Sequence, residues 1–196
     1  MEQRTEEWFE ARRGKITSSK VKVLMAKRGL GETANTYARQ LVADSLLQWF
    51  EEGFVSKDMQ RGIDLEPEAR EAYEAETLQK VTEEGFITEN EHEGSSPDGL
   101  VGDNGQIEIK CPNVDNHMKY LLMDSCPPEY YDQVQHQLYC SGRDWNDFVS
   151  YNSDFKQEHQ LKIIRVYPNE EWVEAYETRR EEFLIVINNY KEKLCS

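Results

Sequence analysis

Hydrophobic residues recur along much of the chain at the spacing that one face of a helix requires. Helices are expected over residues 5–13, 17–28, 34–52 and 130–139, over a segment whose apolar stripe runs through Met59, Ile63, Ala69 and Tyr73, and over a last segment that follows Asn169 and carries Trp172, Tyr176, Phe183, Ile187 and Tyr190. Apolar stretches predict strands over residues 80–88, 95–111, 148–152 and 161–167. Helices on both sides of a mixed central β-sheet make this an α/β fold.

Two of the expected helices carry more specific predictions. The buried side of the helix over residues 34–52 is expected to consist of Leu41, Leu46, Trp49 and Phe50. In the following helix, Glu66 falls on the apolar stripe, where an ionised carboxylate is costly unless it is paired or binds a metal. Glu66 is therefore either salt-bridged, with Arg70 one turn later as the partner, or a ligand directed at a site. Pro67 cannot donate a backbone hydrogen bond, so a kink is expected near Glu66.

A short stretch around a glycine-containing turn holds two acids and a lysine, Asp98, Glu108 and Lys110. Ile107 and Ile109 flank Glu108, so strand alternation puts both isoleucines on one face and Glu108 with Lys110 on the other. Carboxylate oxygens suit Mg²⁺ or Mn²⁺, which polarise a phosphoryl oxygen and activate water, and a lysine beside them stabilises transition-state charge. The order Pro-Asp, nine residues, Glu-Ile-Lys matches the PD-(D/E)xK pattern of nucleases. The alternative is a solvated strand face with a cross-strand ion pair.

The same stretch restricts how its hairpin pairs if Asp98 is to share the face of Glu108. The two residues share a face only when paired residue numbers sum to an even value, because a slip by one residue moves every side chain across the sheet. A two-residue loop gives an odd sum. A three-residue loop over residues 103–105 gives an even sum, pairs residue 98 with residue 110, and uses Gly105 for the left-handed conformation that such loops need.

Length and composition indicate one domain. With 196 residues, 38% hydrophobic and 11% aromatic, the chain is long enough for one core and marginal for two, so a single nuclease domain over residues 1–196 is expected. The sequence shows neither a signal peptide nor a membrane span, which predicts a cytoplasmic protein. The cysteines, Cys111, Cys126, Cys140 and Cys195, lack Cys-x-x-Cys spacing, so reduced thiols are expected and an iron–sulfur cluster is not.

The net charge of −15 is unusual for a protein that binds DNA, because contacts from Lys and Arg to phosphates supply most of the nonspecific affinity. Residues 1–30 hold eight Lys or Arg and four Glu, a charge of +4, which leaves −19 for residues 31–196. A basic rim on an acidic body holds DNA at one place and repels it elsewhere. The alternative is a solvated pair of amphipathic helices.

Five blocks in a fixed order resemble the phage lambda exonuclease family, the YqaJ-type viral recombinase nucleases. They span residues 4–19 (RTEEWFEARRGKITSS), 61–70 (RGIDLEPEAR), 96–99 (SPDG), 107–112 (IEIKCP) and 131–139 (YDQVQHQLY). The resemblance implies a restriction-endonuclease-like core and a 5′-to-3′ exonuclease that acts on double-stranded DNA ends and leaves a 3′ overhang for a single-strand annealing protein. It also implies a ring-shaped homotrimer, two Mg²⁺ ions for which Mn²⁺ substitutes, and, for a phage-encoded protein, the host cytoplasm.

The resemblance also assigns roles to individual residues. The catalytic and metal-binding residues would be Asp98, Glu108, Glu66, Lys110 and Ile109, of which all but Lys110 are metal ligands. The residues that bind DNA or its 5′-phosphate would be Arg12, Ser19, Ser96, Gln133 and Gln135. Gln133 and Gln135 share one face only if their segment is extended, because a helix separates them. Arg12 has a plainer explanation as the surface of a short helix beside Glu7 or Glu10.

Two other functions remain compatible with the sequence. The first is a structure-specific or single-strand endonuclease of the same superfamily, which differs in cutting closed circular DNA. The second is a non-catalytic acidic mimic of DNA. A mimic needs negative charge but no lysine between carboxylates, so Lys110 argues against it.

Overall fold

The computed structural model describes residues 1–48 and 56–195 of the chain. Its α-helices are α1 (Glu6–Arg12), α2 (Glu32–Leu46), α3 (Lys57–Thr77), α4 (Val114–Leu121), α5 (Pro128–Ser141) and α6 (Glu170–Cys195), and its short 3₁₀ helices are η1 (Val21–Val23) and η2 (Gln157–His159). Its strands are β1 (Ile16–Thr17), β2 (Val81–Thr82), β3 (Ile87–Thr88), β4 (Glu93–Ser95), β5 (Gly99–Val101), β6 (Gly105–Lys110), β7 (Trp145–Tyr151) and β8 (Leu161–Val166).

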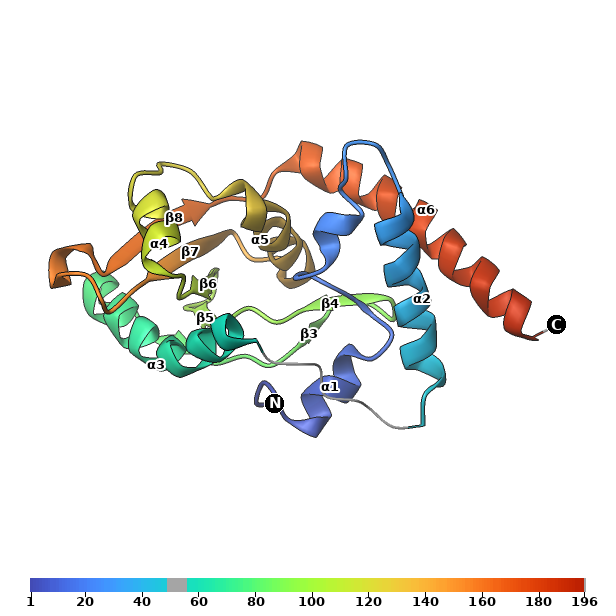
Figure 1. Cartoon of the computed structure of the whole chain (residues 1–196), viewed down its shortest axis with the longest axis horizontal. Helices are drawn as coiled ribbons and strands as arrows, with labels where there is room; N and C mark the ends of the chain where they lie inside the picture. The colour runs from blue at the N-terminus through green and yellow to red at the C-terminus, as the bar shows by residue number, and fades with distance from the viewer. Residues whose placement is uncertain (49–55, 196) are drawn as a thin grey trace.

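The larger sheet is mixed and has helices on both faces. Its five strands follow the order β2-β5-β6-β7-β8, with β6 and β7 parallel and the other neighbours antiparallel. Ala69 and Tyr73 of α3 pack against one face, and Tyr120 of α4 with Val134 and Leu138 of α5 packs against the other. Figure 1 shows α3 below the sheet and α4 and α5 above it. The α/β architecture expected from the sequence is confirmed.

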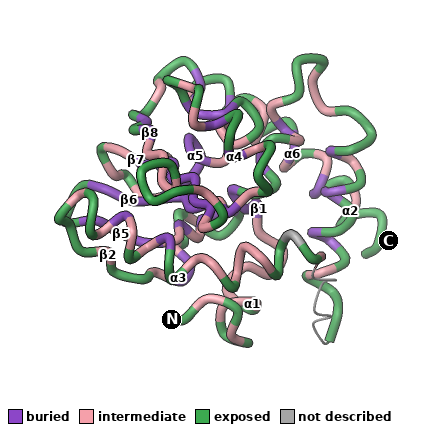
Figure 2. Tube along the Cα trace, turned by 60° about the vertical axis from the view of Figure 1, so that its left-hand side comes forward, coloured by how far each residue is buried: buried purple, intermediate pink, exposed green. Residues whose placement is uncertain are grey.

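A second, three-stranded sheet has the order β1-β4-β3 and packs beside η1, α2 and α6. The final helix begins where expected, because Asn169 Oδ1 accepts a hydrogen bond from the backbone N–H of Trp172 at 3.2 Å. Tyr176 and Phe183 of this helix are fully buried. Figure 2 shows buried residues concentrated where β6, β1 and α5 meet, with exposed residues along the outer surface. Ile16 of β1 therefore shares one hydrophobic cluster with residues of η1, α2 and α6.

Several expected elements differ from the structure. The helix expected over residues 17–28 is wrong, because Ile16 and Thr17 pair with Glu93 and Gly94 of β4, and only the short η1 follows. The strand expected over residues 80–88 is two strands, of which β2 belongs to the larger sheet and β3 to the smaller. The helix α4 has no counterpart among the expected elements. In each case a partner distant in the sequence, or a short length, hides the element from local periodicity.

The helices α2 and α3 follow the expected pattern in part. Leu41 of α2 is buried as expected, but Leu46 is 64% exposed, because it is the last residue of the helix and lies outside the cluster that buries Leu41. Trp49 and Phe50 lie outside the described residues. The helix α3 is continuous through Pro67.

The β5–β6 hairpin has the expected parity in a different register. Gly99 pairs with Ile107 and Val101 with Gly105, so paired numbers sum to an even value and Asp98 shares a face with Glu108. The register nevertheless brings residue 98 level with residue 108 rather than 110, and the loop is 102–104. Gly102 takes the positive φ of 54° that was expected for Gly105. Gly105 instead makes room for an aromatic ring, because a Cβ there would lie 2.0 Å from Cζ2 of Trp145.

All four cysteines are free, and three of them are buried. Burial raises the pKa of Cys111 and of Cys126 to about 12, and it raises the pKa of Cys140 well above the usual range. Cys195, near the end of α6, is exposed.

Within residues 1–48 and 56–195, no helix is both long and apolar enough to cross a bilayer.

Candidate active site

Two carboxylates lie level with each other at the end of the β5–β6 hairpin. Asp98 stands directly before β5, and its backbone N–H donates to the carbonyl of Ile107 at 3.0 Å, which extends the antiparallel pairing. Asp98 Oδ2 accepts a hydrogen bond from the backbone N–H of Ile109 at 2.7 Å. The strand β6 thus fixes both the position of Glu108 and the orientation of the Asp98 carboxylate.

Three side chains hold Glu108, which is 1% exposed. Lys110 Nζ and Gln133 Nε2 donate to its Oε1, and Gln137 Nε2 donates to its Oε2. Gln133 and Gln137 are four residues apart on α5, so both amides project from the same side of the helix. Asn146 Nδ2 donates to Gln137 Oε1 at 2.9 Å, which directs the NH₂ of Gln137 at Glu108.

The electrostatics of the site favour an additional cation. Burial, together with the charges of Glu108 and Glu66, raises the pKa of Asp98 well above its usual range. Burial by itself lowers the pKa of Lys110, but Glu108 and Asp98 outweigh it, so the pKa of Lys110 lies above its usual value and the amine keeps its proton. A buried pair of acids with only one ammonium beside it is stabilised by further positive charge.

Glu66 reaches the same site from α3. Its Oε1 accepts from Arg70 Nη2 and its Oε2 from Arg4 Nη2, both at 2.9 Å. Arg70 Nη2 also lies 3.4 Å from the carbonyl of Asp98. The ion pair with Arg70 that the sequence predicted is therefore confirmed, and Glu66 also lines the pocket described next.

A pocket of about 560 Å³ opens over these groups. Of the residues expected at the site, those that line it are Ser19, Glu66, Asp98, Ile109, Lys110 and Gln133. Glu108 contacts this lining through Lys110 and Gln133. Two further cations, Lys22 from η1 and Arg61 from α3, also line the pocket. Acids, a lysine and additional positive charge thus surround one space.

Arg12 and Ser96 contact each other and are not part of that lining. Arg12 Nη1 donates to Ser96 Oγ at 3.1 Å, and Trp8 Nε1 donates to the same oxygen at 2.9 Å. The Arg12 guanidinium carbon lies 3.9 Å from the Trp8 ring centroid, a cation–π contact. Burial lowers the pKa of Arg12 to about 10, so the guanidinium remains charged at neutral pH. Arg12 is therefore a cation held in place by Ser96, which lies two residues before Asp98 in the sequence, and is not free helix surface.

Gln135 does not reach the pocket, contrary to expectation. Its Nε2 donates to the carbonyl of Tyr167 and its Oε1 accepts from the N–H of Asn169, both at 2.9 Å, so Gln135 holds the connection between β8 and α6. The reason is that residues two apart on a helix point to different sides. Gln137 takes the position beside Glu108, and its spacing of four residues from Gln133 is the sequence signal that identifies it.

The donor set fits a divalent ion. Within the described parts of the chain, no three or more His, Cys, Asp and Glu side chains lie together as a metal-binding group. The oxygen donors are instead the carboxylates of Asp98 and Glu66 and the backbone of Ile109, which line the pocket, and the carboxylate of Glu108 behind this lining. Hard oxygen ligands of this kind suit Mg²⁺ or Mn²⁺, and burial and the neighbouring acids that raise the pKa of Asp98 are consistent with positive charge at this place.

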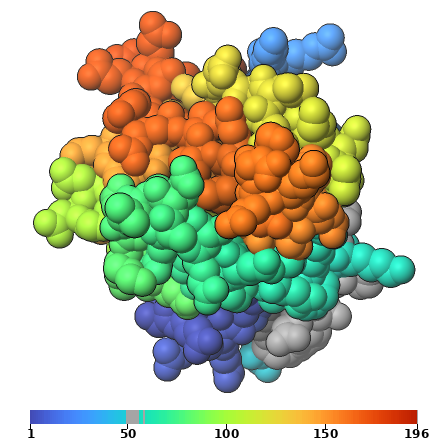
Figure 3. Space-filling model, turned by 90° about the vertical axis from the view of Figure 1, so that its left-hand side faces the viewer, coloured from blue at the N-terminus to red at the C-terminus, as the bar shows by residue number. Residues whose placement is uncertain are grey.

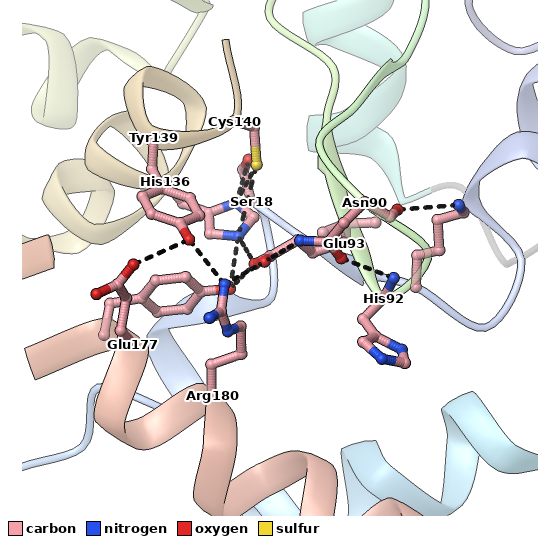
Figure 4. Close-up of polar contacts among 12 residues, drawn as sticks. Ser18, Asn90, His92, Glu93, His136, Tyr139, Cys140, Glu177 and Arg180 are labelled. Atoms are coloured by element: carbon pink, nitrogen blue, oxygen red, sulfur yellow. Dashed lines mark hydrogen bonds and ion pairs between the residues drawn. The ribbon is translucent and has the colours of Figure 1, made fainter. Parts of the chain in front are cut away.

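A buried polar cluster, which local sequence patterns do not indicate, lies around Glu93 of β4. Glu93 is fully buried and accepts hydrogen bonds from His136 Nε2 at 3.3 Å, Arg180 Nη1 at 2.7 Å and Tyr176 OH. His136 Nδ1 also lies 2.8 Å from Ser18 Oγ. Figure 4 shows these side chains converging from β4, α5, α6 and the segment after β1. The cluster joins the small sheet to α5, the helix that carries Gln133 and Gln137.

Known proteins share both the sequence pattern and the fold of this chain. The model of the YqaJ-like viral recombinase domain matches residues 7–144. The chain belongs to this family. Among solved structures, the YqaJ-like chain is similar to the alkaline exonuclease LHK-Exo from Laribacter hongkongensis, with 40% identity, a TM-score of 0.89, and coverage of 97% of this chain and 96% of that one. A phage-related exonuclease from Haemophilus somnus 129PT shares the fold at 18% identity, with a TM-score of 0.73 and coverage of 92% and 96%.

A search of curated protein sequences gives no significant match. The YqaJ-like family and the likeness to an alkaline exonuclease support a nuclease role and confirm the restriction-endonuclease-like PD-(D/E)xK core. The likeness to LHK-Exo also extends over the acidic C-terminal third, which lies beyond the five sequence blocks.

Proposed function

We propose that this chain is a Mg²⁺-dependent 5′-to-3′ exonuclease that acts on the ends of linear double-stranded DNA and leaves a 3′ single-stranded overhang for recombination by strand annealing. The observation that carries the proposal is the Asp98–Glu108 pair, level across the hairpin, with Lys110 bonded to Glu108 and lining one pocket together with Asp98. The likeness to LHK-Exo supports the substrate class, since that protein has also been solved in complex with dAMP, a deoxynucleoside monophosphate.

The residues of the chain divide the work as follows. Asp98, Glu108 and Ile109 would hold Mg²⁺ or Mn²⁺, with Glu66 as a further carboxylate and two ions per site. When bound, the ion supplies Lewis-acid polarisation of a phosphoryl oxygen and a more acidic water. Lys110 carries positive charge at the wall of the pocket, where it stabilises negative charge that develops on the phosphoryl group.

The glutamines of α5 act on Glu108 rather than on DNA. Gln133 and Gln137 donate to different oxygens of this carboxylate and therefore fix its plane. Asn146 prevents the Gln137 amide from rotating, because its NH₂ donates to the Gln137 carbonyl oxygen. A carboxylate held in this way is oriented before substrate arrives, which is the condition for efficient electrostatic catalysis.

The test of the function uses a linear duplex labelled separately at each 5′ and 3′ end. With Mg²⁺, loss of the 5′-ended strand and persistence of the 3′-ended strand are expected, whereas excess chelator stops the reaction. Ca²⁺ should support binding without turnover, because it accepts looser coordination and activates water less well. Full activity in chelator would contradict the metal site. Cutting of closed circular DNA would favour the endonuclease, and absence of any cleavage would favour the acidic mimic.

The role of Arg12 gives a separate prediction. A guanidinium recognises a terminal phosphate with paired charge-assisted hydrogen bonds, so duplexes with a 5′-phosphate should be degraded faster than those with a 5′-hydroxyl. Arg12→Ala should reduce that preference about tenfold, which corresponds to the loss of one charged hydrogen bond. Arg13→Ala is the matched control, because Arg13 contacts Glu10 and the carbonyl of Leu47 instead of Ser96. An unchanged ratio in Arg12→Ala would assign phosphate recognition to other residues, of which Ser19 in the pocket is the first candidate.

The assembly belongs to the same proposal. A ring-shaped homotrimer would let duplex enter on one side and a single strand leave on the other, and a single-strand annealing protein would receive that strand. Light scattering should give three times the mass of the chain. Capture of the annealing protein should depend on the presence of single-stranded product.

A further inference from the structure

The cations that line the pocket differ in how they are paired. Arg4 pairs with Glu66, and Lys110 pairs with Glu108, so the site's own carboxylates occupy both. Lys22 is exposed and has no ion pair among the described residues. Arg61 is held from outside the pocket, which makes it a positioned positive charge that the acids of the site do not neutralise.

Arg61 is fixed by a buried anchor. Its Nη2 donates to Asn152 Oδ1 and to Asp154 Oδ2, both at 3.2 Å. Asn152 is fully buried and donates through Nδ2 to the carbonyl of Pro112 at 3.0 Å, which ties the guanidinium to the end of β6. Figure 3 shows the segment that follows β7, in orange, lying directly against α3. The position of Arg61 is therefore set before any ligand binds.

Most of the hydrogen-bonding capacity of this guanidinium is unused. A guanidinium has five N–H donors, and only Nη2 of Arg61 has partners among the described residues. Its Nε is buried without an acceptor, which is uncommon in folded proteins. Asp154, the carboxylate partner, is 58% exposed, so solvent weakens that ion pair. An anionic oxygen brought to this side of the pocket meets little competition from the protein.

We propose that Arg61 is a binding residue for a backbone phosphate of DNA, next to the phosphodiester that lies over Asp98 and Lys110. A guanidinium forms paired, charge-assisted hydrogen bonds with phosphate oxygens. Asn113 and Asn116 line the same pocket, and their amides offer neutral donors to a bound strand. Contacts to the backbone position a nucleic acid without reading its sequence, so Arg61 sets the register of the strand in the pocket. This inference rests on the proposed function.

The test measures how DNA binding depends on salt. Binding of a labelled linear duplex is titrated against NaCl in excess chelator, in an Asp98→Asn background, so that two independent blocks prevent cleavage. Arg61→Gln should bind about tenfold more weakly at low salt. The plot of log affinity against log salt has a negative slope. Arg61→Gln should make this slope less steep by about 0.9, the value for one phosphate contact on duplex DNA. The loss should be equal for AT-rich and GC-rich duplexes. Arg61→Lys, which keeps the charge, should retain most of the slope.

The control is Arg39→Gln, which removes an exposed arginine of α2 that pairs with Glu32 and does not line the pocket. This variant should keep the wild-type slope, and thermal unfolding confirms that each variant is folded. A wild-type slope in Arg61→Gln, with or without weaker binding, overturns the inference. If the wild-type protein degrades linear duplex with Mg²⁺ and only the slope result fails, the proposed function stands. If the wild type does not degrade DNA, the function fails independently of Arg61.

Discussion

Asp98→Asn is expected to slow degradation of a linear duplex by at least about a hundredfold while the protein stays folded. Partners that merely orient a metal ligand cost about 10–100-fold when removed, so loss of a carboxylate that would bind the metal should cost no less. Stability should be maintained or increased, because burial, Glu108 and Glu66 raise the pKa of Asp98 and so disfavour its ionised form in the folded protein. The amide oxygen of Asn still accepts from the N–H of Ile109.

The measurement compares initial rates with Mg²⁺ alongside urea unfolding of the same samples. Asp103→Asn is the matched control, because it removes an exposed carboxylate from the loop of the same hairpin and should leave both quantities unchanged. If Asp98→Asn degrades DNA at nearly the wild-type rate, Asp98 is not part of a metal site, and the acids and lysine form only an ion pair on the face of a strand. A loss of cooperative unfolding would assign Asp98 a structural role.

Glu93→Gln should lower the free energy of unfolding by about 3–5 kcal/mol at pH 7, the range for removal of one partner from a buried ion pair. Burial alone would raise the pKa of Glu93, but hydrogen bonds from His136, Tyr176 and Asn90 lower it to about 2. That depression alone corresponds to about 3 kcal/mol at neutral pH. Gln keeps the shape but turns an NH₂ group toward residues that already donate, one of which is Arg180.

The pH dependence of this effect follows from the depressed pKa. Since the pKa of Glu93 in the folded protein lies below its ordinary value of 4.5, its contribution is complete above about pH 4.5 and is lost as the pH falls toward 2. Urea titrations of wild type and Glu93→Gln should therefore converge on acidification. Burial lowers the pKa of His136 and Glu93 partly offsets this lowering, so the protonation of His136 is coupled to Glu93 and adds to the difference between the two proteins until Glu93 is itself protonated. Glu177→Gln, which removes an exposed partner of Tyr139, should change stability by less than about 0.5 kcal/mol. A constant difference across pH would show that Glu93 acts through packing alone.

The sequence predicted the elements whose signals are local. The capping residue Asn169 and the long apolar stripe after it located α6, and the even parity of the β5–β6 hairpin placed Asp98 on the face of Glu108. The exact register did not follow, because Gly102 and Gly105 both permit the turn. Contact between Gly105 and Trp145, forty residues later, decides between them. Parity is a property of alternation along one strand, whereas register depends on tertiary packing.

The same distinction explains the site. The sequence predicted the acids and the lysine of the site because they fall in the stretch over residues 96–112 and in the helix that carries Glu66. The structure brings Asp98, Lys110 and Glu66 to one pocket and Glu108 to its wall. Gln137 was missed, although the helix expected over residues 130–139 already separates Gln135 from Gln133 and places residue 137 one turn on. The cluster around Glu93 had no local signal, because its members come from four distant segments.

The distribution of thiols has a practical consequence for labelling this protein. The thiolate is the nucleophile that attacks a thiol-reactive dye, and burial of Cys111, Cys126 and Cys140 raises their pKa values and so disfavours the thiolate. Cys195 alone is exposed, near the end of α6, and it does not line the pocket. A maleimide fluorophore is therefore expected to attach at a single defined position outside the pocket without mutagenesis, which suits single-molecule observation.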